Sequence, residues 1–75
     1  MIRLKYERLD RGITQKQFEF LSGVPQPVIC LIETGRWSPT DAELTQLARV
    51  LGVHPPSALL REVVVEPASG EAVTR

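Results

Sequence analysis

The chain has 75 residues, with nine Lys and Arg against nine Asp and Glu, and a single cysteine, Cys30. A chain this short forms one domain with one core and a narrow stability margin, which dimerisation is expected to supplement. One cysteine excludes an internal disulfide. With His54 and carboxylates as the other available ligands, we expect neither a metal site nor a cofactor. The balanced charge argues against a protein that binds polyanions through bulk charge alone.

Charge is nevertheless distributed unevenly. Residues 1–37 carry six basic and four acidic groups, a net charge of +2, whereas residues 38–75 carry three and five, a net charge of −2. The N-terminal half is therefore the half expected to face an anion. We recognise no signal peptide, and the longest apolar run, Val28 to Ile32, is too short to span a bilayer. A cytoplasmic protein without membrane contact is expected.

Two short helices are expected in the first third of the chain. The first has about ten residues, and Gly12 follows it as a stop signal. Its apolar residues at helical spacing are Ile2, Tyr6 and Leu9. Thr14 and Gln17 have the form of a capping box, which predicts a second helix that ends at Gly23. The residues expected on its buried face are Phe18 and Leu21.

A third helix is expected from Pro25 to Thr34, with Gly35 as its stop. At about 100° per residue, one side of this helix packs on the core and the other is presented. The packing side holds Ile29, Ile32 and the edge residue Val28. The presented side holds Gln26, Pro27, Cys30, Leu31 and Thr34. The tight Ser22–Val24 turn joins the second and third helices as in a helix-turn-helix, which lets one helix enter a DNA groove.

Thr40 with Glu43 forms a second capping box, which predicts a fourth helix closed by Gly52. The apolar stripe of this helix is Leu44, Leu47, Ala48 and Leu51. Pro55 and Pro56 then open a short fifth helix, for which His54 is a candidate cap. Its residues expected to return to the core are Leu59 and Leu60. The fold class is therefore all-α, a compact five-helix bundle.

The helical pattern stops at residue 62, which divides the chain into a domain over 1–62 and a tail over 63–75. The segments Val63–Glu66 and Glu71–Thr74 favour extended structure and can pair as a hairpin across Pro67–Gly70. An isolated hairpin is marginal in water. Two alternatives stay open for the tail: disorder, or a strand that pairs with a second subunit as a dimerisation element.

The chain resembles the Xre and phage repressor-Cro family of helix-turn-helix domains over about residues 2–61. The residues that carry the resemblance are Ile13-Thr14-Gln15-Lys16, the Phe18…Leu21-Ser22-Gly23-Val24 turn, Ile29…Ile32-Glu33-Thr34-Gly35, Pro39 and Leu47-Ala48…Leu51-Gly52-Val53. The resemblance implies a lambda-repressor-like bundle that binds a palindromic operator as a dimer. It also implies a structural ion pair between Arg8 and Glu33, and a phosphate contact from Gln15.

The expected DNA contacts come from the third helix and from residues on either side of it. Gln26 is the candidate for base reading, because glutamine bonds adenine N6 and N7 together. Arg36 and Lys16 are expected to meet phosphates, with Thr34 as a neutral donor beside Arg36. The residues expected to contact thymine methyl groups are Pro27, Val28 and Leu31.

The chain departs from the family pattern in two places. The third helix is unusually apolar, and its two prolines remove N–H groups that could meet a phosphate. Glu19 stands where the family usually has a small residue, and Phe20 follows it. Either Phe20 lies at a subunit interface or the packing around it is rearranged.

Two functions are weighed. The main hypothesis is a dimeric, sequence-specific transcriptional regulator that places helix 25–34 in the major groove of double-stranded DNA, without an effector domain or small-molecule ligand. The alternative is a protein-interaction module whose apolar third helix docks on a protein partner. An enzyme is not expected, because the sequence offers neither a nucleophile with a base nor a metal constellation.

Overall fold

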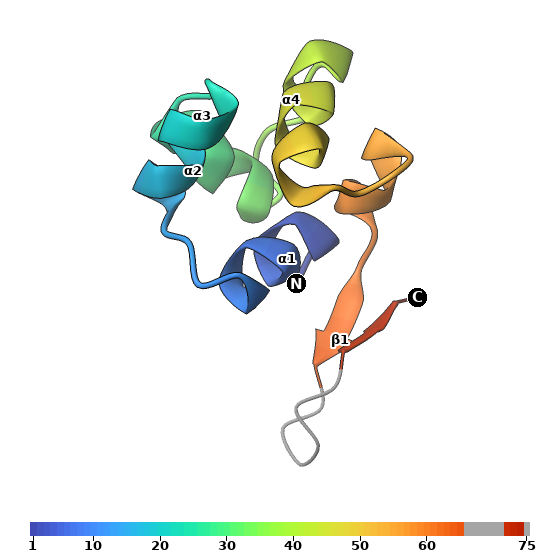
Figure 1. Cartoon of the computed structure of the whole chain (residues 1–75). Helices are drawn as coiled ribbons and strands as arrows, with labels where there is room; N and C mark the ends of the chain where they lie inside the picture. Colours follow the sequence, from blue (N-terminus) through green and yellow to red (C-terminus); the bar gives the residue numbers. More distant parts are fainter. Residues whose placement is uncertain (66–71, 75) are drawn as a thin grey trace.

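The computed structural model describes residues 1–65 and 72–74. In this part of the chain, four α-helices are followed by a 3-10 helix and two strands (Figure 1). The elements are α1 (Arg3–Asp10), α2 (Gln15–Ser22), α3 (Gln26–Glu33), α4 (Asp41–Leu51), η1 (Pro56–Leu60), β1 (Val63–Val65) and β2 (Ala72–Thr74). The expected helical bundle is confirmed, but its count of five α-helices is not.

The fifth element is a short 3-10 helix that begins at Pro56, directly after another proline. Pro55 is its N-cap, and the Ala58 N–H donates to the Pro55 carbonyl at 2.9 Å, an i to i+3 bond. The Arg61 N–H donates to the Ala58 carbonyl at 3.2 Å in the same pattern, which is typical of a short 3-10 helix. The expected cap by His54 is wrong, since no side chain caps η1 and His54 is exposed.

Both predicted capping boxes are present. The Gln17 N–H donates to Thr14 Oγ1 at 3.0 Å, and the Thr14 N–H donates to Gln17 Oε1 at 2.8 Å. Thr40 and Glu43 repeat the exchange at 3.1 and 2.8 Å. These side chains satisfy N–H groups that a helix start leaves without partners, which explains where α2 and α4 begin.

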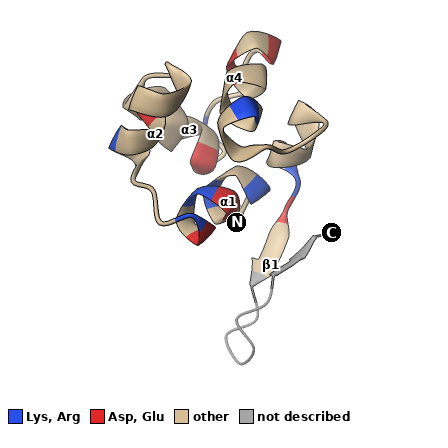
Figure 2. Ribbon diagram, in the orientation of Figure 1, with Lys and Arg blue, Asp and Glu red and all other residues tan. Residues whose placement is uncertain are grey.

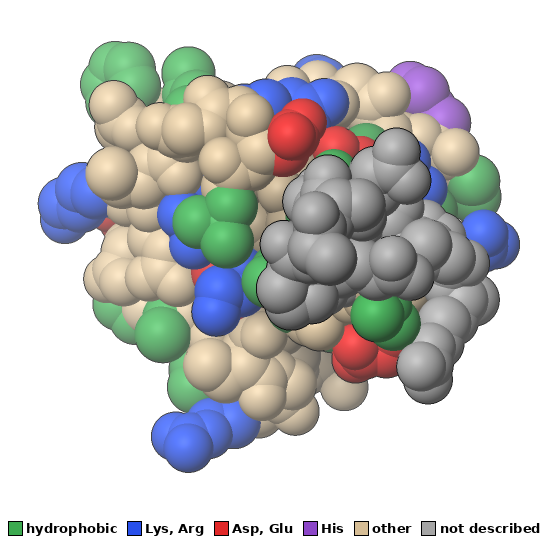
Figure 3. All heavy atoms as spheres, turned by 90° about the horizontal axis from the view of Figure 1, so that it is seen from below, with side chains coloured by type: hydrophobic (Ala, Val, Ile, Leu, Met, Phe, Trp, Pro, Cys, Tyr) green, Lys and Arg blue, Asp and Glu red, His purple; other side chains and the backbone are tan. Residues whose placement is uncertain are grey.

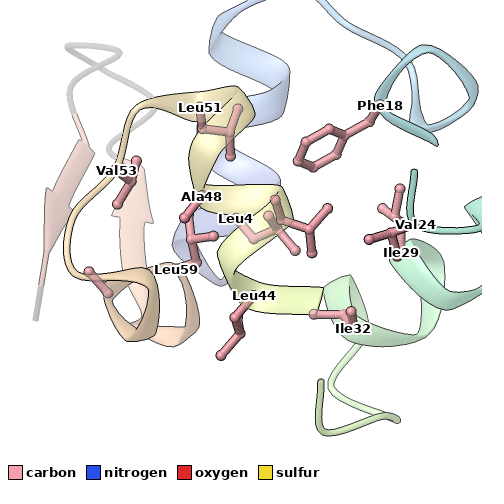
Figure 4. Packing of buried hydrophobic residues seen from close by; sticks show 12 residues of the cluster. Leu4, Phe18, Val24, Ile29, Ile32, Leu44, Ala48, Leu51, Val53 and Leu59 are labelled. Carbon is pink, nitrogen blue, oxygen red and sulfur yellow. The ribbon is translucent and has the colours of Figure 1, made fainter. Parts of the chain in front are cut away.

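The core lies where α1, α2, α3, α4 and η1 meet, and their apolar side chains point toward one another (Figure 4). Its largest fully buried side chains are Phe18, Leu4, Ile29, Ile32, Leu47, Leu59 and Val24. As predicted, α4 buries Leu44, Leu47, Ala48 and Leu51. The core therefore draws on every helix, and it fixes how α2 and α3 are presented.

Two leucines expected in the core are not buried. Leu21 is 56% exposed, and Leu60 is 42% exposed. Leu21 stands about 60° around α2 from the buried Phe18, beyond the area that the neighbouring helices cover. Leu60 directly follows the buried Leu59, and at three residues per turn the two point about 120° apart. The neighbouring elements therefore cover Phe18 and Leu59 but leave Leu21 and Leu60 exposed.

The strands form a hairpin that is joined to the start of the chain. β1 pairs antiparallel with β2 in the register Val63↔Thr74. The connecting segment expected over Pro67–Gly70 lies outside the described residues. On the other side of β1, the Val63 N–H donates to the Met1 carbonyl at 2.8 Å. Figure 1 shows the hairpin extending away from α2 and α3.

An arginine connects α1 to the end of α4. The Arg11 Nη2 donates to the Leu51 carbonyl at 2.7 Å, where a cation is favourable against the helix dipole. Glu7 accepts hydrogen bonds from Arg11 and from Arg3. Burial raises the pKa of Glu7, but the hydrogen bonds from Arg11 and Arg3 and their positive charges outweigh it and hold the pKa below its usual range. The carboxylate thereby helps to orient Arg11.

We predict that Leu59→Ala lowers the free energy of unfolding by about 2–5 kcal/mol, because it leaves a cavity in the core. Its neighbour supplies the control. Leu60→Ala is expected to cost less than about 1 kcal/mol, since the Leu60 side chain already contacts solvent. Urea denaturation of both variants measures the difference, and equal losses would contradict the observed burial.

Candidate nucleic-acid interface

The turn between α2 and α3 is held by its own residues. The Ser22 hydroxyl donates to the Phe18 carbonyl at 2.7 Å and accepts from the Val24 N–H at 3.1 Å. Gly23 adopts φ +80°, a conformation that favours glycine. Val24 is buried against the core. The turn thus joins two packed helices and leaves the outer side of α3 at the surface.

An ion pair between α1 and α3 lies beneath this surface. The Arg8 Nε donates to Glu33 Oε2 at 2.7 Å, and the Arg8 Nη2 donates to Glu33 Oε1 at 3.1 Å. The two side chains are only 9% and 1% exposed. A third donor of Arg8, Nη1, bonds the Ile13 carbonyl in the α1–α2 loop at 2.8 Å. Arg8 therefore connects α1, the loop and α3.

Two glutamines extend this ion pair toward the surface. The Gln15 Nε2 donates to Glu33 Oε1 at 2.9 Å. The Gln26 Nε2 donates to Gln15 Oε1 at 2.7 Å. Gln15 and Gln26 are the first residues of α2 and α3, and both are half-buried. The result is a continuous chain of hydrogen bonds from Arg8 to Gln26.

A surface groove of about 540 Å³ lies over the two glutamines. The residues that line it are Arg8, Leu9, Gly12, Ile13, Thr14, Gln15, Lys16 and Gln26. Because Gln15 and Lys16 occupy the first turn of α2, their backbone N–H groups have no partner within the helix. The Lys16 side chain is 84% exposed and adds its ammonium group. The groove therefore offers several donors to an anion.

The sequence predicts eight DNA-contacting residues, and in the structure these residues lie in three groups. Gln15, Lys16 and Gln26 lie together in the groove. Pro27 and Leu31 are exposed on α3, whereas Val28 is half-buried and packs against the core. Thr34 and Arg36 follow at the C-terminal end of α3, and both are exposed.

The Thr34 hydroxyl already has partners within its helix. It donates toward the Cys30 and Leu31 carbonyls at 3.0 and 3.2 Å. A donation from Thr34 to a phosphate would therefore require its hydroxyl hydrogen to turn away from these carbonyls. Arg36, which is also exposed, is the charged candidate for a phosphate contact at this end.

The connection between the two glutamines was not anticipated from the sequence. The sequence predicts a phosphate contact for Gln15 and a base contact for Gln26, with no link between the two. One signal was available: Gln26 and Glu33 are seven residues apart, so they lie on the same side of α3, about 10 Å along its axis. A polar residue at the start of α2 can bridge two such positions. Predicting this bridge requires knowing how α2 packs on α3.

The outer side of α2 carries an apolar hollow that adjoins the groove at Ile13 and Lys16. It measures about 430 Å³ and is lined by Ile13, Lys16, Gln17, Phe20 and Leu21. Phe20 is 88% exposed, so it does not fill the core. Glu19 forms a surface ion pair with Lys16 at 3.4 Å. Beside this unusual Glu19-Phe20 sequence, Phe18 is fully buried and Glu19 is half-buried.

Charge is mixed over the molecule. Residues of both signs lie along α1, whereas α3 is uncharged until its last residue (Figure 2). Seen from below, basic and hydrophobic side chains are interspersed on the visible face (Figure 3). In the described part of the chain, no group of three or more His, Cys, Asp or Glu side chains could hold a metal ion. None of the described helices has the length and apolar character needed to cross a membrane.

Comparison with known proteins identifies the family of this chain. A family model described as helix-turn-helix matches residues 4–57, which run from the second residue of α1 through α4 to the second residue of η1. This chain belongs to the helix-turn-helix family. The resemblance to Xre-type domains, read from the residues, is thereby confirmed.

Two relatives of this helix-turn-helix protein are named as HTH-type transcriptional regulators. One, from Haemophilus influenzae, is 49% identical over 45 residues, which are 60% of this chain and 46% of the relative. The other, y4dJ from Sinorhizobium fredii, is 41% identical over 46 residues, which are 61% of this chain and 60% of the relative. The match thus spans about half the length of these relatives. No solved structure matches the chain with significant similarity.

We predict that Arg8→Met lowers the free energy of unfolding by about 3–5 kcal/mol, because the buried carboxylate of Glu33 loses its cation. Adding Glu33→Leu should recover much of this loss, since no buried charge then remains. Arg49→Met, at an exposed position of α4, is the control and should cost less than about 1 kcal/mol. Urea denaturation compares the three variants. A loss for Arg8→Met no larger than the control's would show that the pair adds nothing to stability.

Proposed function

We propose that this helix-turn-helix protein is a transcriptional regulator that binds duplex DNA with α3 in the major groove. The observation that carries the proposal is the hydrogen-bonded pair of Gln15 and Gln26 at the first turns of α2 and α3. An α-helix fits the width of the major groove, and glutamine pairs with an adenine edge there. The helix-turn-helix match and the names of both relatives support the same function.

In this proposal, different residues supply position and sequence preference. Lys16, Arg36 and the N–H groups at the start of α2 contact phosphates on either side of α3. Gln26 reads a base edge, and the exposed Pro27 and Leu31 contact thymine methyl groups. Val28 contributes less to the DNA surface, because it packs against the core. Such a regulator works in the compartment that holds the DNA, in agreement with the cytoplasm expected from the sequence.

The proposed regulator binds as a dimer, in which two copies of α3 enter successive major grooves about 34 Å apart on a palindromic operator. A single chain presents one short α3 and few base-reading side chains, so a second copy would double the contacts. The alternative, in which α3 docks on a protein, is not favoured, because both relatives are named transcriptional regulators.

We expect selection from a random duplex DNA library at near-physiological salt to enrich a palindrome with half-sites one helical turn apart. Sequencing the pool after several rounds gives the operator directly. Folded protein that enriches nothing would contradict the DNA-binding proposal. Enrichment of a single, non-repeated half-site would contradict the dimer alone.

Gln26→Ala and Arg36→Ala are expected to change different properties of DNA binding. Gln26→Ala should reduce discrimination at one base pair by about 1–3 kcal/mol. Arg36→Ala should weaken binding to all sequences alike and lower the slope of log affinity against log salt by about one. Titration of labelled duplexes at several salt concentrations measures both. Unchanged base preference removes Gln26 from base reading, and an unchanged slope removes Arg36 from the phosphate contacts.

A further inference from the structure

We infer that Glu33, which lies beneath the interface, determines which base Gln26 accepts by fixing the orientation of two side-chain amides. The inference rests on the proposed function and assigns Glu33 as a positioning residue for it. The Glu33 side chain is 1% exposed, so it cannot contact DNA itself. Its effect on a base must pass through Gln15, the residue that touches both Glu33 and Gln26.

Glu33 determines which group donates and which accepts in the hydrogen bonds that follow. A carboxylate accepts hydrogen bonds and donates none, and Arg8 holds both oxygens of Glu33 from the side of α1. Only the NH₂ group of the Gln15 amide can therefore face Glu33 Oε1, at 2.9 Å. The opposite orientation would place two acceptors against each other.

The same constraint passes to the next amide. With its NH₂ group on Glu33, Gln15 turns its carbonyl oxygen toward Gln26. Only the NH₂ group of Gln26 can meet this oxygen, and it does so at 2.7 Å. One buried carboxylate thus fixes the orientation of both glutamines, the second of which lies at the surface.

This orientation limits what Gln26 can present to a base. One N–H of its Nε2 is used by Gln15, so the carbonyl oxygen and one further N–H remain. Adenine offers a matching donor at N6 and acceptor at N7 in the major groove. Guanine offers acceptors at both O6 and N7, so the Gln26 carbonyl would face an acceptor. The structure therefore favours adenine over guanine at the base pair that Gln26 reads.

Without the carboxylate, the preference should be lost. Two glutamine side chains can pair in either direction, because each amide has both a donor and an acceptor. If Gln15 turns, Gln26 can turn with it and present both N–H groups, which suit guanine. A residue at position 15 that only donates would impose this second orientation on Gln26.

The test measures binding to two duplexes that differ only in A·T against G·C at the base pair read by Gln26. The wild type is expected to prefer A·T by about 5- to 150-fold. Glu33→Gln should reduce this ratio by at least several fold. Gln15→Lys, which offers only donors and leaves the Arg8–Glu33 pair intact, should abolish or reverse it. Gln46→Met, at an exposed position of α4, is the control and should leave the ratio unchanged.

The ratio separates positioning from a merely structural role. A structural role for Glu33 would weaken binding to both duplexes alike and leave the ratio as in the wild type, which would overturn the inference. Thermal unfolding checks that each variant is folded. If Glu33→Gln alone is unfolded, the double variant Arg8→Met with Glu33→Gln takes its place, since it leaves no unpaired buried charge.

Failure of this inference is distinguishable from failure of the proposed function. If the wild type binds no duplex, both are overturned. If it binds and Gln26→Ala removes the A·T preference, while the Glu33 and Gln15 variants retain it, only the role of Glu33 is overturned. If Gln26→Ala also retains it, Gln26 does not read the base and the inference fails with that assignment.

Discussion

The buried pair of Arg8 and Glu33 is the constraint on which the interface depends. Two charges removed from water must satisfy each other and their remaining hydrogen-bonding capacity, and here they do so through Ile13 and Gln15. No buried side-chain nitrogen or oxygen among the described residues lacks a hydrogen-bond partner. Because these bonds start from α1 and end on α2 and α3, the two helices of the helix-turn-helix cannot shift independently of α1.

This arrangement suits a chain with no net charge. A strongly basic domain can hold DNA through many phosphate contacts, but such contacts carry no sequence information. Here the groove combines one exposed lysine with neutral amides and backbone N–H groups, and Arg36 lies at the far end of α3. In the proposed function, recognition thus depends more on the direction of a few hydrogen bonds than on the amount of positive charge.

Local signals in the sequence predicted the local structure well. Thr14 and Thr40 mark helix starts through contacts with residues three positions away, so both capping boxes could be read directly. Leu21 and Leu60 were misplaced, because helical periodicity does not say how far neighbouring helices cover a face. The bridge made by Gln15 joins residues far apart in the chain, and only the packing of α2 on α3 brings them together.

The prolines before α3 and in its first turn do more than remove N–H groups, because they also restrict the backbone. Pro25 is the N-cap and Pro27 the second residue of the helix, and each ring restricts its own φ before any partner arrives. The first turn, which carries Gln26, therefore has few alternative backbone conformations to lose. In the proposed complex with DNA, association then costs less conformational entropy, and more of the contact energy appears as affinity.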